Sequence, residues 1–114
     1  NKIFLNSSKK VYRGYMNSDD LIKWIIKIMI NSDTKCNIYN VGSDEAITIK
    51  QLANIIAQKF KKNVFVKNKN ISKDDIDYYV PSISKAKKEL NLINKLNIVK
   101  SLDQILKVWD HNIF

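Results

Sequence analysis

The segment that decides the fold is Ile38–Phe60, which reads I-Y-N-V-G-S-D-E-A-I-T-I-K-Q-L-A-N-I-I-A-Q-K-F. Its first residues, Ile38 to Val41, predict a short buried strand, and the polar turn after them contains Gly42. An amphipathic helix follows, because apolar residues recur with the period of one helix face: Ile49, Leu52, Ala53, Ile56 and Phe60. The segment therefore predicts a strand, a turn and a helix in succession.

Two signals mark the start of this helix. Thr48 followed by Gln51 forms a capping box, in which each side chain binds an amide that the helix leaves unpaired. Ile47 before the cap and Leu52 after it are spaced as a hydrophobic staple. We therefore expect the helix to span residues 48–60.

The chain before this segment predicts a hairpin and a helix. Residues 1–16 contain two strand-like runs around a polar turn, and Gly14 in the second run marks a bulge or a close backbone approach. The helix runs from Asp19 to Ile30 with Asn17 or Ser18 as its cap, and the helix dipole alone explains Asp19 and Asp20. Its expected inward residues are Leu21, Trp24, Ile25 and Ile28.

The chain after this segment predicts a strand at Val64–Val66, a polar loop at 67–77 and an extended stretch ending at Pro81. Ser82 or Ser84 opens a short helix, and a capping box at Ser101 and Gln104 opens the last one. The expected inward residues of these two helices are Ile83, Ala86, Leu90, Leu102, Ile105, Leu106 and Trp109. The predicted fold class is α/β, with about four helices around a few short strands.

Composition predicts an ordinary globular domain covering residues 1–114, with 45% hydrophobic and 27% charged residues. The first residue is Asn1 and not Met, which favours a fragment or a processed product. No signal peptide is recognisable, and the longest apolar run, Trp24–Ile30, is too short to span a membrane. The single cysteine, Cys36, favours a reducing compartment, so we expect a cytoplasmic protein.

The net charge of +9 raises the question of nucleic-acid binding. Nineteen of the twenty basic residues are lysines scattered through every segment, a pattern that is typical of a solvated basic face. We therefore keep a basic module that binds nucleic acid or a protein partner as the alternative function.

Residues for catalysis and for cofactor or metal binding are missing from the sequence. With only Gly14 and Gly42, no glycine-rich phosphate loop can form, and the lone His111 has no partner for a metal site or a catalytic triad. Helix caps explain the two Ser-x-x-Lys pairs, at 82–85 and 84–87. We expect no catalytic residue, no metal and no cofactor in this chain.

Three residues point to ligand binding. Arg13 is the only arginine, and a planar guanidinium binds phosphate or carboxylate through two parallel hydrogen bonds, which lysine cannot do. Asn40 and Gly42 lie at the end of a predicted buried strand, just before a turn, where loops of α/β folds collect ligands.

Four stretches then resemble one family in their order and spacing. The chain is similar to the C-terminal part of the NAD-dependent nucleotide-sugar epimerases and dehydratases, which are extended short-chain dehydrogenases/reductases, and dTDP-glucose 4,6-dehydratase-like members are nearest. The stretches are R-G-Y-M-N-S-D-D-L (13–21), Y-N-V-G-S-D-E-A-I-T-I-K-Q-L-A (39–53), Y-V-P-S-I-S-K-A-K-K-E-L-N-L (79–92) and S-L-D-Q-I (101–105).

The resemblance implies that an N-terminal Rossmann domain of the parent enzyme holds NAD and the catalytic residues. The C-terminal part closes over the nucleotide-diphosphate end of the substrate, where Arg13 contacts phosphate or nucleoside and Asn40 lies nearby. With Gly42 and Tyr79 these residues form the expected substrate-binding set. Many members carry a second arginine just before the segment matching Tyr79, where this chain has Asp77-Tyr78. The implied function is the substrate-binding portion of such an enzyme, inactive alone, with a nucleotide-diphosphate sugar and the NAD-binding domain as partners.

Overall fold

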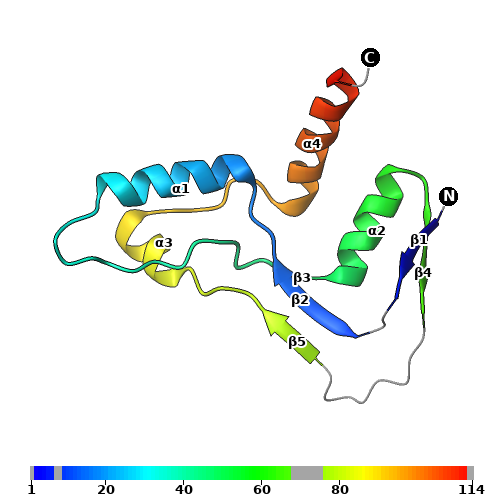
Figure 1. The fold of residues 1–114 in the computed structure, drawn as a ribbon, viewed down its shortest axis with the longest axis horizontal. Helices are drawn as coiled ribbons and strands as arrows, with labels where there is room; N and C mark the ends of the chain where they lie inside the picture. Colours follow the sequence, from blue (N-terminus) through cyan, green and yellow to red (C-terminus); the bar gives the residue numbers. More distant parts are fainter. Residues whose placement is uncertain (1, 7–8, 68–75, 113–114) are drawn as a thin grey trace. The chain divides into compact units, whose positions relative to one another are not determined.

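The computed structural model describes residues 2–6, 9–67 and 76–112, with side chains as far as residue 108. It divides the chain into two compact units, each made from two separate chain segments (Figure 1). Unit 1 comprises Asn1–Arg13 and Ala46–Tyr79, and unit 2 comprises Gly14–Glu45 and Val80–Phe114. Nothing in this division tests the assignment of residues 1–114 to one substrate-binding domain, which stays a prediction.

The described residues of unit 1 form two small sheets and one helix. Strand β1 (Lys2–Leu5) pairs in parallel with β4 (Asn63–Val66). In the second sheet, β2 (Lys10–Gly14) lies between β3 (Ala46–Thr48) and β5 (Ile76–Tyr79), and it pairs in parallel with β5.

The predicted hairpin of residues 1–16 is therefore wrong, although both of its strands exist. Each strand pairs with a distant partner, and aromatic rings meet across both pairs: Phe4 with Phe65 at 5.7 Å and Tyr12 with Tyr78 at 5.5 Å between centroids. The turn sequence N-S-S-K contains no glycine, which the tightest hairpin turns favour. The long-range aromatic contacts thus decide the pairing.

The helix α2 (Ile49–Lys59) begins as predicted. The Gln51 amide donates to Thr48 Oγ1 at 3.1 Å, and the Thr48 amide donates to Gln51 Oε1 at 2.8 Å, so the capping box is confirmed. The buried face of α2 includes Ala53 and Ala57, and the helix contacts β1, β3 and β4. Phe60 is 49% exposed because it lies beyond the last helical residue, so its predicted inward position is wrong.

Unit 2 is built from three helices: α1 (Ser18–Ile30), α3 (Ser84–Leu90) and α4 (Ile98–Asn112). Trp24 of α1 lies at the centre of its core and is 1% exposed. The core also contains Ile83, Ala86, Leu90 and Leu92, which confirms the predicted inward face of α3. Met16, Ile28 and Tyr39 pack around this cluster.

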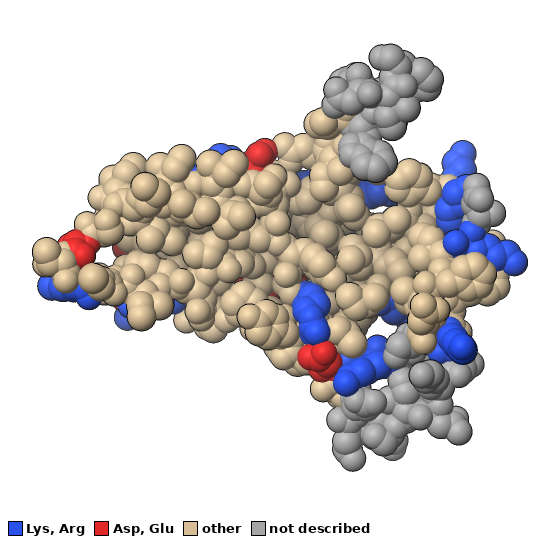
Figure 2. Space-filling model, viewed as in Figure 1, with Lys and Arg blue, Asp and Glu red and all other residues tan. Residues whose placement is uncertain are grey.

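The inward face of α1 is narrower than predicted. Trp24 and Ile28 face the core, but Leu21 and Ile25 are 38% and 44% exposed. A second apolar stripe on α1, at helical spacing, is exposed, and Figure 2 shows few charged side chains over this helix. We call these residues the α1 apolar face: Ile22, Ile25, Ile26, Met29 and Ile30.

The predicted strand at Ile38–Val41 is wrong. These residues form an irregular segment that none of the described strands pairs with, and Ile38 is 82% exposed. Side chains hold the segment to α3 and the residues before it, because Lys85 Nζ donates to the Ile38 carbonyl and Asn40 Nδ2 donates to the Ser82 carbonyl, both at 3.1 Å. An apolar run alone therefore did not determine a strand.

The helix starts of unit 2 agree with the prediction in part. Asn17 caps α1 as expected, and α3 begins at Ser84, one of the two predicted starts, but neither Ser82 nor Ser84 caps it. Helix α4 begins at Ile98, and Asn97 Oδ1 accepts from the Lys100 amide at 3.0 Å. Asparagine caps helices as well as serine does, which explains the earlier start.

Ser101 lies inside α4, where its hydroxyl donates to the Asn97 carbonyl at 2.8 Å. Leu102 and Leu106 are half-buried, but Ile105 is 51% exposed. Residues 68–75 of the predicted polar loop and the side chains of Trp109 and His111 lie outside the described residues. Among the residues that are described, no helix has the length and apolar content needed to cross a membrane.

Candidate functional site

One face of the β2–β5 pair brings together two of the predicted site residues. The parallel register aligns Arg13 with Tyr79 and Val11 with Asp77. Because side chains alternate along a strand, Arg13, Asp77 and Tyr79 share one face. Tyr12 and Tyr78 share the opposite face, where their rings pack together.

The guanidinium of Arg13 binds the Asp77 carboxylate through two hydrogen bonds. Nη1 donates to Oδ1 at 3.2 Å and Nη2 donates to Oδ2 at 2.8 Å, while Nη1 also donates to the Tyr12 carbonyl at 2.7 Å. The hydrogen bond from Arg13 lowers the pKa of Asp77 below its ordinary value. The ring of Tyr79 lies 6.0 Å from Arg13 Cζ and is 75% exposed. We call Arg13, Asp77 and Tyr79 the arginine cluster.

The other two predicted site residues lie in unit 2. Asn40 is exposed, and its amide donates to the Ser82 carbonyl. The Gly42 carbonyl accepts from Asn94 Nδ2 at 3.0 Å, and a Cβ on Gly42 would lie 2.7 Å from Pro81 Cγ. These hydrogen bonds are structural, because they tie the 38–45 segment to residues 81–94.

Gly14 confirms the expected close backbone approach. A Cβ at this position would lie 2.1 Å from the Ser43 carbonyl oxygen. Protein atoms thus occupy the position that a Cβ would take on either glycine, so a larger residue fits at neither position without a shift of its neighbours. The expectation that this chain binds no cofactor stays a prediction.

The sequence reasoning missed two residues of these groups. Asp77 is the ion-pair partner of Arg13. It lies two residues before Tyr79, a spacing that puts both side chains on the same face of a strand, and this spacing was the sequence signal that could have identified it. Asn94 holds the Gly42 carbonyl, and its own Oδ1 is buried without a hydrogen-bond partner among the described residues. No sequence pattern marked Asn94.

Described residues of unit 2 line clefts at two places. One, of about 250 Å³, lies at the start of α1, where Gln104 donates to Asp19 at 2.8 Å and accepts from Asn17 at 3.2 Å. The other, of about 280 Å³, lies beside Trp24 and is lined by Lys23, Lys27 and Lys95, among others.

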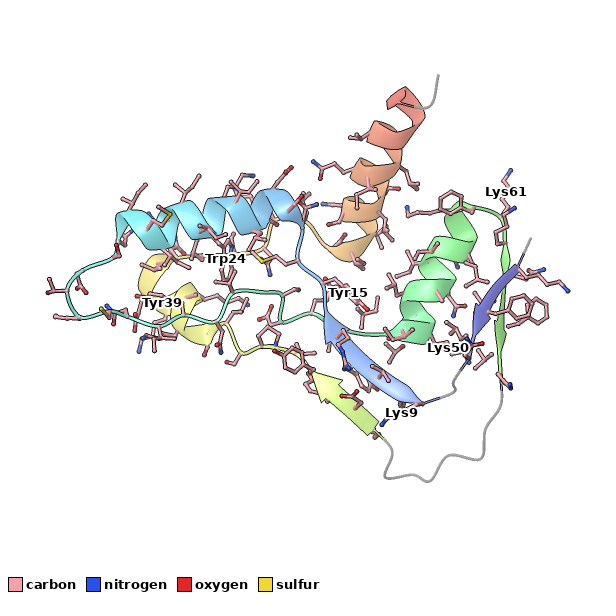
Figure 3. The ribbon with its side chains drawn as sticks, viewed as in Figure 1. Lys9, Tyr15, Trp24, Tyr39, Lys50 and Lys61 are labelled. Carbon is pink, nitrogen blue, oxygen red and sulfur yellow. The ribbon has the colours of Figure 1, made fainter. Side chains whose placement is uncertain are left out.

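Tyr39 belongs to the packing of unit 2 (Figure 3). Its hydroxyl donates to Glu89 at 2.8 Å, and Lys85 Nζ lies 4.8 Å from its ring centroid. The hydrogen bond to Glu89 raises the pKa of Tyr39, so this phenol stays protonated. Tyr39 therefore joins the 38–45 segment to α3.

The basic residues are divided almost evenly between the two units, whereas most of the acidic residues belong to unit 2. Unit 1 contains eleven basic and three acidic residues, whereas unit 2 contains nine basic and eight acidic residues. Lysine side chains gather over α2, β1 and β4 on the face shown in Figure 2. Most of the net charge therefore belongs to unit 1, and Asp77 is the one acidic residue among those described there. The described residues contain no group of three or more potential ligands that could hold a metal ion.

Comparisons with solved structures find nucleotide-sugar enzymes. UDP-glucose 4-epimerase from Thermotoga maritima, solved with UDP-glucose, matches 99% of this chain with a TM-score of 0.79 and 18% identity. UDP-N-acetylglucosamine 4-epimerase from Bacillus cereus matches 96% with a TM-score of 0.75 and 26% identity. The enzyme WbmG from Bordetella bronchiseptica, solved with NAD and UDP, matches 97% with a TM-score of 0.72 and 19% identity.

The chain has the fold of the C-terminal part of an extended short-chain dehydrogenase/reductase. It spans only about a third of these proteins, from 34% to 38% of their lengths in the three comparisons. No protein-family model and no curated protein matches the sequence.

Proposed function

We propose that this chain is the substrate-binding portion of an NAD-dependent enzyme that modifies nucleotide sugars. The arginine cluster supports the proposal, since the only arginine presents two donors in the geometry that a phosphate accepts. The exposed ring of Tyr79 beside it offers an apolar face to a nucleobase. The fold shared with UDP-sugar epimerases supports the same substrate class.

The subfamily of the parent enzyme, its NAD cofactor and its compartment are also part of the proposal. The sequence resemblance favours a dTDP-glucose 4,6-dehydratase-like parent, whereas the similar solved structures named above include 4-epimerases of UDP-sugars. Comparing dTDP-glucose with UDP-glucose as ligands distinguishes the two. The parent enzyme holds NAD elsewhere, works in the cytoplasm and supplies the catalytic residues, so this chain is inactive alone.

The α1 apolar face is where we place the NAD-binding domain of the parent. Met29 and Ile30 at its end are 67% and 76% exposed, and an apolar stripe of this kind is typical of a surface that another element covers. The similar solved structures are about three times as long as this chain, so they contain enough additional protein to cover such a face.

Titration of the 114-residue chain with UDP-glucose and dTDP-glucose, followed by amide NMR, tests the function. We expect weak binding, with a Kd near 1 mM or about −4 kcal/mol, and shifts at Arg13 and Tyr79. Asn40 and Gly42 stay predicted substrate contacts, which the same spectra test separately.

Variants of Arg13 sharpen this experiment. Arg13→Lys keeps the charge but loses the paired donors, so it should weaken binding nearly as much as Arg13→Ala. Lys10→Ala is the matched control, because it removes an exposed cation from the same strand. Equal effects of Lys10→Ala and Arg13→Ala would show that only general charge attracts the ligand.

The concentration of charge in unit 1 favours the alternative function, a basic module that binds nucleic acid. Non-specific binding of this kind should weaken steeply between 50 and 200 mM salt and should not depend on the sugar. A salt series with a short duplex DNA and with UDP-glucose separates the two functions. Strong, salt-sensitive DNA binding without UDP-glucose shifts would favour the alternative.

A further inference from the structure

The carboxylate of Asp77 already occupies the two donors that would bind a phosphate. Its two oxygens meet Nη1 and Nη2 of Arg13 in the paired arrangement that guanidinium forms with both carboxylates and phosphates. A phosphate cannot bind both nitrogens in this way while Asp77 remains there. Resting on the proposed function, we propose that Asp77 is a built-in competitor, which an incoming nucleotide diphosphate must displace from Arg13.

The surroundings of the ion pair make displacement feasible. The side chains of Arg13 and Asp77 are 31% and 42% exposed, so water screens their attraction. Asp77 lies near the start of β5, and its carboxylate, at 42% side-chain exposure, is open to solvent. Exposed ion pairs of this kind correspond to an equilibrium constant K of about one to four. Because an internal competitor weakens ligand binding by the factor 1 + K, Asp77 should weaken it about two- to fivefold.

The charge of unit 1 indicates why this particular carboxylate matters. Asp77 is the only described acidic residue in a unit that carries most of the net charge. Removing it therefore leaves Arg13 in a basic surface without the one acidic partner found among the described residues of this unit. The gain in affinity should depend on the phosphate of the ligand and on Arg13, and not on the nucleoside.

The test measures the affinity of the 114-residue chain for UDP-glucose and for uridine, which lacks phosphate. Asp77→Asn should tighten UDP-glucose binding about two- to fivefold and leave uridine binding unchanged. Asp77→Ser is a second variant, because an asparagine oxygen can still accept one bond from Arg13. Asp33→Asn, an exposed loop residue, changes the net charge equally and should have no such effect. Amide spectra of β2 and β5 show whether each variant keeps the fold.

Two further measurements distinguish competition by Asp77 from a general effect of charge. In an Arg13→Ala background, Asp77→Asn should no longer tighten binding. In the wild-type chain, the carboxyl carbon signal of Asp77 should move toward that of a free carboxylate as UDP-glucose is added.

The outcomes distinguish this proposal from the proposed function. Binding by wild type that Asp77→Asn and Asp77→Ser leave unchanged or weaken would overturn the competitor role, and the substrate-binding function would stand. Absence of UDP-glucose binding in wild type and in all variants would overturn both. Binding that appears only after Asp77 is replaced would support both.

Discussion

The sharpest stability prediction concerns Asp20, which is 2% exposed near the start of α1. Its Oδ2 accepts from the Lys95 amide at 2.8 Å and from the Leu96 amide at 3.0 Å. Each hydrogen bond to a charged group contributes about 1.5–3 kcal/mol, and Asp20→Ala removes both. Because the variant no longer has to bury a carboxylate, part of this loss is offset. We expect the free energy of unfolding to fall by about 3–4 kcal/mol.

Asp19→Ala is the matched control, since Asp19 occupies the same first turn and has the same charge. It is half-buried, and its carboxylate accepts a hydrogen bond from Gln104 at 2.8 Å. Its loss should cost about 1 kcal/mol or less. Asp20→Asn, which keeps an acceptor for the two amides, should fall between the two alanine variants.

Urea unfolding followed by tryptophan fluorescence measures these differences. Trp24 lies one turn after Asp20 and is buried in the core of unit 2. A Trp109→Phe background removes the second tryptophan, so that the signal reports Trp24 alone. If the Asp19 and Asp20 alanine variants lose the same stability, then Asp20 acts only through the helix dipole, as the sequence predicted, and the reasoning from its buried bonds is refuted.

The remaining predictions use the same unfolding assay or NMR. Thr48→Ala should cost about 1 kcal/mol through loss of the capping box, whereas Thr34→Ala in an exposed loop should change stability by less than about 0.5 kcal/mol; equal midpoints would mean that the box does not form in solution. Ile83→Ala should lower stability by about 2–5 kcal/mol because Ile83 is 1% exposed, whereas Ile22→Ala on the α1 apolar face should be nearly neutral. An Ile83→Ala variant as stable as the wild type would contradict the core described above. Arg13 lowers the pKa of Asp77, so their pair should stabilise the fold fully above pH 3.8, the ordinary pKa of an aspartate, and should lose this effect as the pH falls through the lower pKa of the folded state. A carboxyl-carbon NMR titration of Asp77 with its midpoint at or above 3.8 would contradict this.

Local signals in the sequence predicted local structure well. The Thr48–Gln51 capping box, the Asn17 cap and the inward face of α3 all depend on residues within about one or two turns of each other. Gly14 was also interpreted correctly, because only a residue without a side chain fits beside the Ser43 carbonyl.

Long-range structure could not be predicted in this way. The Ile38–Val41 run has strand-like residues, but none of the described strands pairs with it. The partner of Arg13 is Asp77, which is 64 positions away, and only the parallel register of β2 and β5 brings the two together. The sequence thus identified Arg13 as a candidate without showing that a carboxylate holds it.

The parallel pairing of unit 1 has a consequence for how the chain folds during synthesis. Lys2 pairs with Asn63 and Lys10 pairs with Ile76, so β1 and one edge of β2 must wait for partners more than sixty residues later, although the other edge of β2 can pair earlier with β3. At about 5–20 residues per second, a ribosome needs roughly 3–12 seconds to make those later partners. During this time β1 and the β5-facing edge of β2 have unpaired backbone groups, and closing such long loops also slows folding. A chaperone that shields strand edges should therefore raise the yield of folded chain most when it binds these first fourteen residues.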